Sequence, residues 1–277
     1  MKKVSFLLIG LIITATLISC DQTKITDSQD KKLDIEKLET YLDKTGKLHN
    51  KGLDFAYKKL KEKEASKSVA FKSKTSTLNF VKSTTIEFLK QSESKLIKNN
   101  TKAFIKSAEK MISRKKKRAS QTQSTQIKLW EPKISDSLSA VQKKYLSKLN
   151  TALSNSNFGF QDKINAFKNI KATFKKEAPK KEQFVLLAAA QVGINSLQYW
   201  HENKSKWKDL MKNSKSIQLK ESDGSITEAD VDGAVTGAIG VGVYTLYAGP
   251  PGWAGAAGSV LTGAAAGSTY QAIKNMF

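Results

Sequence analysis

The stretch Phe184-Val185-Leu186-Leu187-Ala188-Ala189-Ala190-Gln191-Val192-Gly193-Ile194 decides the fold of this chain. Wound into a helix, it would be apolar on nearly every side, and such a helix is stable in water only when other elements cover it. The sequence therefore predicts that this stretch forms the central helix of a soluble bundle. The apolar character continues to Leu197, Tyr199 and Trp200, so the helix is expected to run on to these residues; His201, Trp207 and Leu210 follow, with lysines between them.

The segments around this stretch repeat apolar residues every three or four positions, as amphipathic helices do. The spacing predicts further helices over residues 33–63, 77–112, 135–155 and 160–178. The first of them can kink at Gly46 or Gly52, and the second is interrupted near Asn99. The last ends before Pro179, because the residue before a proline avoids the helical region. No useful strand alternation occurs before residue 215, so the predicted fold class is all-α.

The N-terminus carries an export pattern. Lys2 and Lys3 precede an apolar run over residues 6–18, which is shorter than the roughly 20 residues of a membrane-spanning helix. Leu17-Ile18-Ser19-Cys20 resembles the lipobox of bacterial lipoproteins. That resemblance implies that residues 1–19 are a signal peptide and that Cys20 is acylated. The alternatives are an ordinary cleaved signal and an N-terminal membrane anchor.

The resemblance to lipoproteins places the protein in the bacterial envelope, anchored to membrane lipid through Cys20 and facing out of the cytoplasm. Residues 20–32 are polar and are expected to form a short flexible tether. Cys20 is the only cysteine, so the exported chain has no internal disulfide and no thiolate metal site. An aspartate at position 21 favours inner-membrane retention under the enteric sorting rule, but other bacteria sort differently, so the membrane is left open.

The net charge is +22, and it is +20 once Lys2 and Lys3 leave with the signal peptide. A charge of this size is typical of proteins that meet polyanions. Because export removes the protein from nucleic acid, the expected partners are anionic lipid headgroups or cell-wall polymers. The alternative is that the lysines only solvate the outer faces of the helices.

The densest basic run is Arg114-Lys115-Lys116-Lys117-Arg118. It follows a predicted helix, where the helix dipole attracts cations, and that placement explains part of the pattern. The sharper hypothesis is that these five residues touch phosphate headgroups.

The composition changes abruptly near Ser225. No charged residue occurs from Gly233 to Ile273, and ten of the sixteen glycines fall in this segment. A Gly-Pro-Pro-Gly turn at residues 249–252 divides it into two halves. Small residues stand four apart within each half, which lets helices approach closely in lipid; they are Gly233, Gly237, Gly255, Ser259, Gly263 and Gly267. The pattern predicts a glycine-zipper helical hairpin over residues 226–277, which associates with a membrane; the alternatives are that it packs on the bundle or stays partly disordered.

Two resemblances concern this segment. Its Gly/Ala-rich composition, as in Ala234-Val235-Thr236-Gly237-Ala238, resembles the tails of class II bacteriocin-like peptides and faintly implies pore formation. The chain also resembles a group of bacterial lipoproteins without an established activity. The resemblance rests on a Gly-x-x-His-Asn-x-x-Leu stretch at residues 46–53, the Tyr199-Trp200 pair and an Asp-x-x-Gly-Ala pattern that begins at Asp230. It implies the architecture alone.

The sequence contains no recognisable catalytic motif. His49 and His201 are the only histidines, and neither stands in a metal-binding spacing. A composite site built from both is the less favoured alternative to a structural hydrogen bond made by His49-Asn50 between helices. We therefore expect no enzyme activity, no cofactor and no metal site.

Together these patterns predict an all-α protein in which a Lys-rich helical bundle, residues 33–220, precedes the Gly/Ala-rich hairpin. The expected function is that of a lipid-anchored envelope protein with a structural or binding role at the membrane surface. The alternative is a membrane-inserting, bacteriocin-like toxin or effector that uses the hairpin. The partner and the oligomeric state are left open.

Overall fold

The computed structural model describes residues 34–65, 74–99, 101–102, 104–106, 108–109 and 138–212, together with residues 227, 230–231, 234, 238, 256–261, 263–265, 267 and 269 of the C-terminal segment. In this part of the chain every regular element is a helix and no strand occurs, so the predicted all-α fold class is confirmed. The described residues belong to one compact unit that begins at Lys32.

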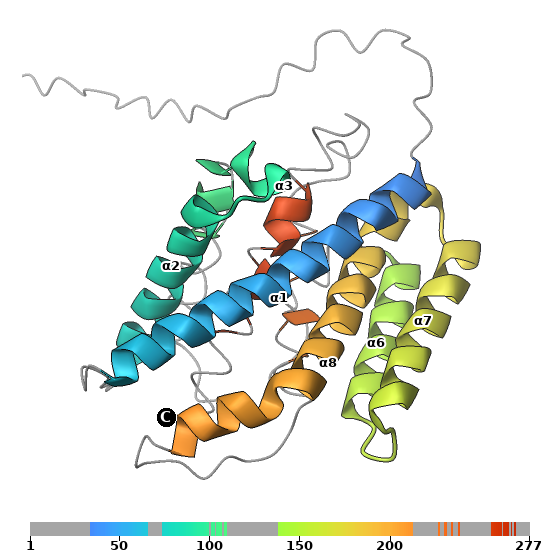
Figure 1. Cartoon of the computed structure of the whole chain (residues 1–277). Coiled ribbons are helices and arrows are strands. Elements are labelled where there is room, and N and C mark those ends of the chain that lie inside the picture. Colours follow the sequence, from blue (N-terminus) through green and yellow to red (C-terminus); the bar gives the residue numbers. More distant parts are fainter. Residues whose placement is uncertain are drawn as a thin grey trace, which may run out of the picture. The chain divides into compact units, whose positions relative to one another are not determined.

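The helix predicted to be central is α8, which spans Gln183–Lys212. It packs against α1 (Ile35–Ala65), α6 (Ala140–Ser154) and α7 (Phe160–Glu177), as Figure 1 shows. Residues 186–190 and Val192 are fully buried. Burying a leucine side chain contributes about 1.5–3 kcal/mol relative to leaving it exposed, so this stretch organises the core as its sequence predicts.

The helix α1 runs through both of its glycines without a break. Gly46 is a point of close approach: a Cβ atom added there would lie 2.4 Å from Nδ2 of Asn195 on α8. At Gly52 the nearest atom would be a ring carbon of Phe88 at 3.4 Å, which is ordinary contact. Gly46 therefore sets the separation of α1 and α8 rather than breaking α1.

Local signals fix the ends of α6 and α7. Ser139 caps α6 in a capping box with Gln142, in which two orphan amides at the helix start are satisfied. The predicted stop at Asn155 is confirmed, since α6 ends at Ser154, and α7 ends just before Ala178-Pro179. The start of α6 falls later than expected, because Leu138 precedes the cap. The short helix η1 (Lys180–Glu182) leads from α7 into α8.

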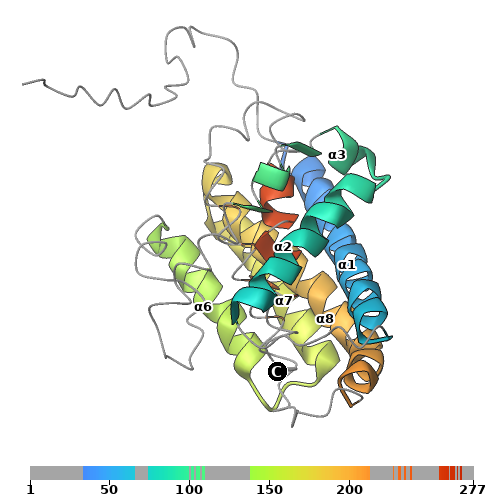
Figure 2. The same ribbon diagram turned by 90° about the vertical axis from the view of Figure 1, so that its left-hand side faces the viewer.

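A smaller cluster of helices packs on α1 (Figures 1 and 2). It contains α2 (Lys74–Gln91) and α3 (Lys95–Lys98). The interruption expected near Asn99 is present as a turn, but a break at residues 92–94 precedes it. The break brings Ile97 of α3 into the same buried cluster as Leu48, Phe88 and Phe104. Tertiary packing thus divides a region that the apolar spacing predicted as nearly continuous.

The described residues of the C-terminal segment lie in the protein core. Val231, Ala234, Ala256, Val260 and Ala264 belong to the same buried cluster as α8. Each is at most 1% exposed. Three of these residues, Ala234, Ala256 and Ala264, have small side chains, which allow the C-terminal segment to approach its neighbours closely. These residues therefore pack against protein.

Candidate functional site

The most distinctive chemistry in the described residues surrounds His49, which lies on the buried face of α1. Its ring is fully buried, and its Nε2 lies 3.3 Å from Oδ1 of Asp230, which is equally buried. Buried charges require partners, because transfer of an isolated ion from water is very costly. The two side chains therefore form an ion pair between α1 and the C-terminal segment.

Asn50 fixes the protonation of the ring. Its Nδ2 donates to the backbone oxygen of Asn195 at 3.0 Å, which directs its Oδ1 toward Nδ1 of His49, also at 3.0 Å. The ring therefore has an acceptor on each side, an amide oxygen at Nδ1 and a carboxylate at Nε2. Only the doubly protonated imidazolium matches two acceptors.

The electrostatics agree with this assignment. Burial alone would lower the pKa of His49, but the negative charge of Asp230 and the hydrogen bond to Asn50 raise the pKa above its ordinary value. The expected hydrogen bond between helices is confirmed in the contact from Asn50 to α8, whereas His49 itself pairs with Asp230.

The second oxygen of Asp230 connects to α8. Ser196 donates its hydroxyl hydrogen to Oδ2 of Asp230, and its Oγ lies 3.4 Å from Oγ1 of Thr227. The other oxygen, Oδ1, accepts no hydrogen bond from the described residues and has only the ion pair with His49. The cluster His49, Asp230, Ser196 and Thr227 thus joins α1, α8 and the C-terminal segment, and all four residues are fully buried.

The residues quoted for the lipoprotein resemblance gather along this α1 and α8 contact. Gly46 admits Asn195, and His49 pairs with Asp230. One helical turn further along, the Tyr199 hydroxyl donates to Oδ1 of Asp54 at 3.1 Å and accepts from Trp207. Burial raises the pKa of Tyr199 far above its usual value, so this hydroxyl stays neutral.

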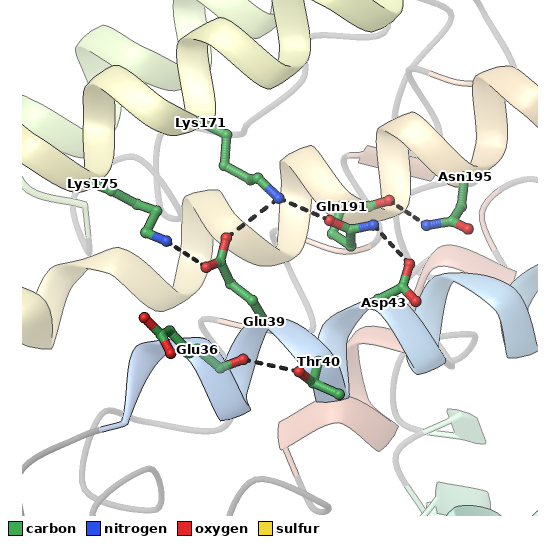
Figure 3. Close-up of polar contacts among 8 residues, drawn as sticks. All are labelled: Glu36, Glu39, Thr40, Asp43, Lys171, Lys175, Gln191 and Asn195. Atoms are coloured by element: carbon green, nitrogen blue, oxygen red, sulfur yellow. Dashed lines mark hydrogen bonds and ion pairs between the residues drawn. The ribbon is translucent and has the colours of Figure 1, made fainter.

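A polar network joins α1, α7 and α8 at the other half of α1 (Figure 3). Glu39 pairs with Lys171 at 3.3 Å and with Lys175 at 2.5 Å. Lys171 also donates to Oε1 of Gln191, whose amide nitrogen donates to Oδ1 of Asp43. These contacts set the register of the three helices.

The two histidines do not form a composite site. His201 on α8 is exposed and stacks on Phe160 of α7, with ring centroids 4.0 Å apart and an interplanar angle of 5°. Beside this pair lies a hollow of about 140 Å³, lined by Phe158, Phe160, Lys163, Leu197, Trp200, His201 and Thr227. Lys163 already donates to the backbone oxygen of Leu153 at 2.8 Å, so its ammonium group satisfies a carbonyl in the last turn of α6.

Several residues singled out from the sequence fall outside the described part of the chain; they are Cys20, Gly233, Gly237, Gly255 and the five basic residues Arg114, Lys115, Lys116, Lys117 and Arg118. Of the remaining zipper positions, Gly263 and Gly267 are buried and Ser259 is partly buried. Their neighbours Val260 and Ala264 contribute to the protein core.

Within the described ranges, no helix combines the length and the apolar character needed to cross a bilayer. The same residues contain no group of three or more His, Cys, Asp or Glu side chains arranged to hold a metal ion.

Sequence reasoning missed the pairing of His49 with Asp230. A signal was present, since Asp230 is one of the last acids before a long uncharged segment and His49 interrupts an apolar stripe. Two isolated polar residues on otherwise apolar helix faces are candidates for an ion pair with each other, because a buried charged group needs a partner. Their contact over 181 positions of sequence is visible only in the fold.

Comparison with protein-family models, with characterised proteins and with solved structures finds no match to this chain.

Proposed function

We propose that this chain is a lipid-anchored protein of the bacterial envelope with a structural or binding role at the membrane surface. The lipobox-like Leu17-Ile18-Ser19-Cys20 supplies the anchor. Several acyl chains on one cysteine hold a protein on a membrane far better than one chain does. The helical domain is then the part that meets partners, and the proposed role is one of binding rather than catalysis.

The observation that carries this choice is the burial of Asp230 and its neighbours in the C-terminal segment. Asp230 is held by His49 and Ser196, and Val231 and Ala234 lie in the core beside α8. Moving the segment into a bilayer would break the ion pair and leave His49 buried without its counter-ion. Breaking a buried pair costs about 3–5 kcal/mol. That cost favours an anchored domain over the alternative, a bacteriocin-like toxin that inserts this segment.

The first test is fractionation of cells that express the Cys20→Ala variant, with Thr23→Ala as a matched control beyond the lipobox. Flotation and alkaline extraction should leave the control in the membrane fraction and release Cys20→Ala into the soluble fraction. Retention of Cys20→Ala in alkali-washed membranes would contradict a purely lipid anchor and point to insertion of the chain itself.

The toxin alternative has its own measurement. Purified mature protein at micromolar concentration is added to dye-loaded vesicles that contain anionic lipid, and release of dye is followed over time. The proposal expects no release. Release that depends on protein concentration would instead support the pore-forming alternative.

A further inference from the structure

One end of the helical domain collects the starts of three helices. Ser139 caps α6 and donates to Oε2 of Glu182 in η1 at 2.6 Å, and Gln183 begins α8 directly afterwards. The first turns of α1 reach the same end, because Glu39 pairs with Lys175 near the end of α7. Each helix start carries about half a positive charge, so three starts beside one helix end make this end electropositive before any side chain is counted.

Lysines add to this potential. Lys176 lies in the last turn of α7, Lys180 and Lys181 lie in η1, and Lys143 lies in the first turn of α6. The first three are exposed, and none of the four has a carboxylate within ion-pair distance among the described residues. We call these four lysines the basic end.

Two of the carboxylates near the basic end are already paired with cations. Glu39 is shared by Lys171 and Lys175, and Glu177 pairs with Lys144 at 3.1 Å, whereas Glu182 accepts from the neutral hydroxyl of Ser139 and keeps its charge. The acid nearest the start of α1, Asp34, pairs with Lys37, and Glu36 beside it is exposed and has no cation partner among the described residues. At this end Glu36 and Glu182 are thus the carboxylates set against the four lysines of the basic end. The excess charge of this end is therefore positive.

The basic end also lies where the chain arrives from Cys20. Thirteen residues separate Cys20 from Asp34, and fully extended they reach about 45 Å. The longest helix, α1, has 31 residues and spans about 46 Å. A fully extended tether is thus about as long as this helix and does not by itself select the face that meets the membrane, so the charge distribution must select it.

We infer that the basic end is the surface with which the domain rests on anionic phospholipid of the membrane that holds Cys20. This inference rests on the proposed lipid anchor and adds an orientation to it. The only large apolar side chain that is exposed among the described residues, Phe158, lies at the opposite end of α7. The contact is therefore electrostatic adsorption to headgroups, and it weakens as salt rises.

The test uses the complete mature chain with Cys20→Ser, so that no acyl chain contributes to binding. Binding is measured by sedimentation with vesicles of phosphatidylcholine alone and with 30% phosphatidylglycerol. The basic-end variant carries Lys176→Gln, Lys180→Gln and Lys181→Gln. The matched control removes the same charge from the second half of α1, where three exposed lysines have no ion pair with any described carboxylate; it carries Lys51→Gln, Lys58→Gln and Lys61→Gln.

Binding to phosphatidylglycerol vesicles at about 0.1 M salt, where the Debye length is about 10 Å, should fall about 100-fold in the basic-end variant, which corresponds to about 1 kcal/mol for each lysine near the surface. The control should lose less than about threefold, since its lysines face away from lipid at distances that salt screens. Thermal unfolding should be the same for all three proteins, because every substituted side chain is exposed.

Three results would overturn the inference. Equal losses in the two variants would mean that net charge attracts the protein in no preferred orientation. No loss in either would place the contact elsewhere, for example at residues 114–118. Equal binding to neutral and anionic vesicles would exclude an electrostatic contact. The mass of the N-terminal peptide from cells reports acylation of Cys20 separately, so the anchor and the orientation can fail independently.

Discussion

Removing the charge of Asp230 should destabilise this protein more than most single substitutions. In Asp230→Asn, the shape is kept, but the imidazolium of His49 loses its counter-ion in a site with no exposure to water. Breaking a buried ion pair from one side costs about 3–5 kcal/mol. Domains are stable by only about 5–15 kcal/mol in total, so the variant should lose a large part of its stability.

The pairing can be separated from general disruption by a double-mutant cycle with His49→Gln. Each single variant leaves one buried group without its partner, whereas the double variant removes both charges together. The double variant should therefore be more stable than the sum of the single losses predicts, by about 1–3 kcal/mol. Urea unfolding followed by helical circular dichroism gives the free energies at pH 6.

The pH dependence provides a second, independent check on the same pair. The folded pKa of His49 is raised, so its stabilising contribution is complete below about pH 6.5, the unfolded pKa. It is lost as the pH rises through the folded pKa, by up to about 1.4 kcal/mol per pH unit. The wild type should lose this increment of stability between pH 6.5 and the folded pKa, and His49→Gln should lack it.

Two results would refute this reasoning. If the two single losses are additive within about 0.5 kcal/mol, His49 and Asp230 do not interact energetically. If the stability of the wild type and of His49→Gln shows the same pH profile above pH 6.5, His49 is not a protonated partner of Asp230.

Two further predictions follow from the contacts of the helices. Gly46→Ala places a Cβ atom 2.4 Å from Nδ2 of Asn195 and should lower the free energy of unfolding by about 1–3 kcal/mol through overpacking. At Gly52→Ala the nearest atom is 3.4 Å away, so this variant should be neutral or more stable by up to about 1 kcal/mol. Equal melting temperatures for the two variants would contradict the close approach at Gly46. Ser139→Ala removes the cap of α6 and should cost about 1 kcal/mol, while Ser147→Ala on the exposed face of α6 should not destabilise; the comparison fails if both variants melt together.

Much of the helical architecture could be predicted from local sequence. The apolar run at residues 184–194 predicted the central helix, Asn155 and Pro179 predicted two helix ends, and all three predictions are confirmed. These features depend on neighbours within a few positions, through side-chain periodicity and the restricted backbone before proline. The break at residues 92–94 was missed; beyond it, Ile97 packs in a buried cluster with Phe88 and with Leu48, which is remote in sequence.

The sequence by itself determined the fold class and the central helix, and it carries the lipobox-like pattern at Cys20 on which the proposed anchor rests. Only the tertiary structure decided what the charged and small residues do. It paired His49 with Asp230, used Gly46 to bring α8 close to α1, and packed Val231, Val260 and Ala264 into the core. The reason is physical: helix formation follows from contacts three or four positions apart, whereas the partner of a buried charge is any residue that the fold brings within a few ångströms, and no local pattern names it.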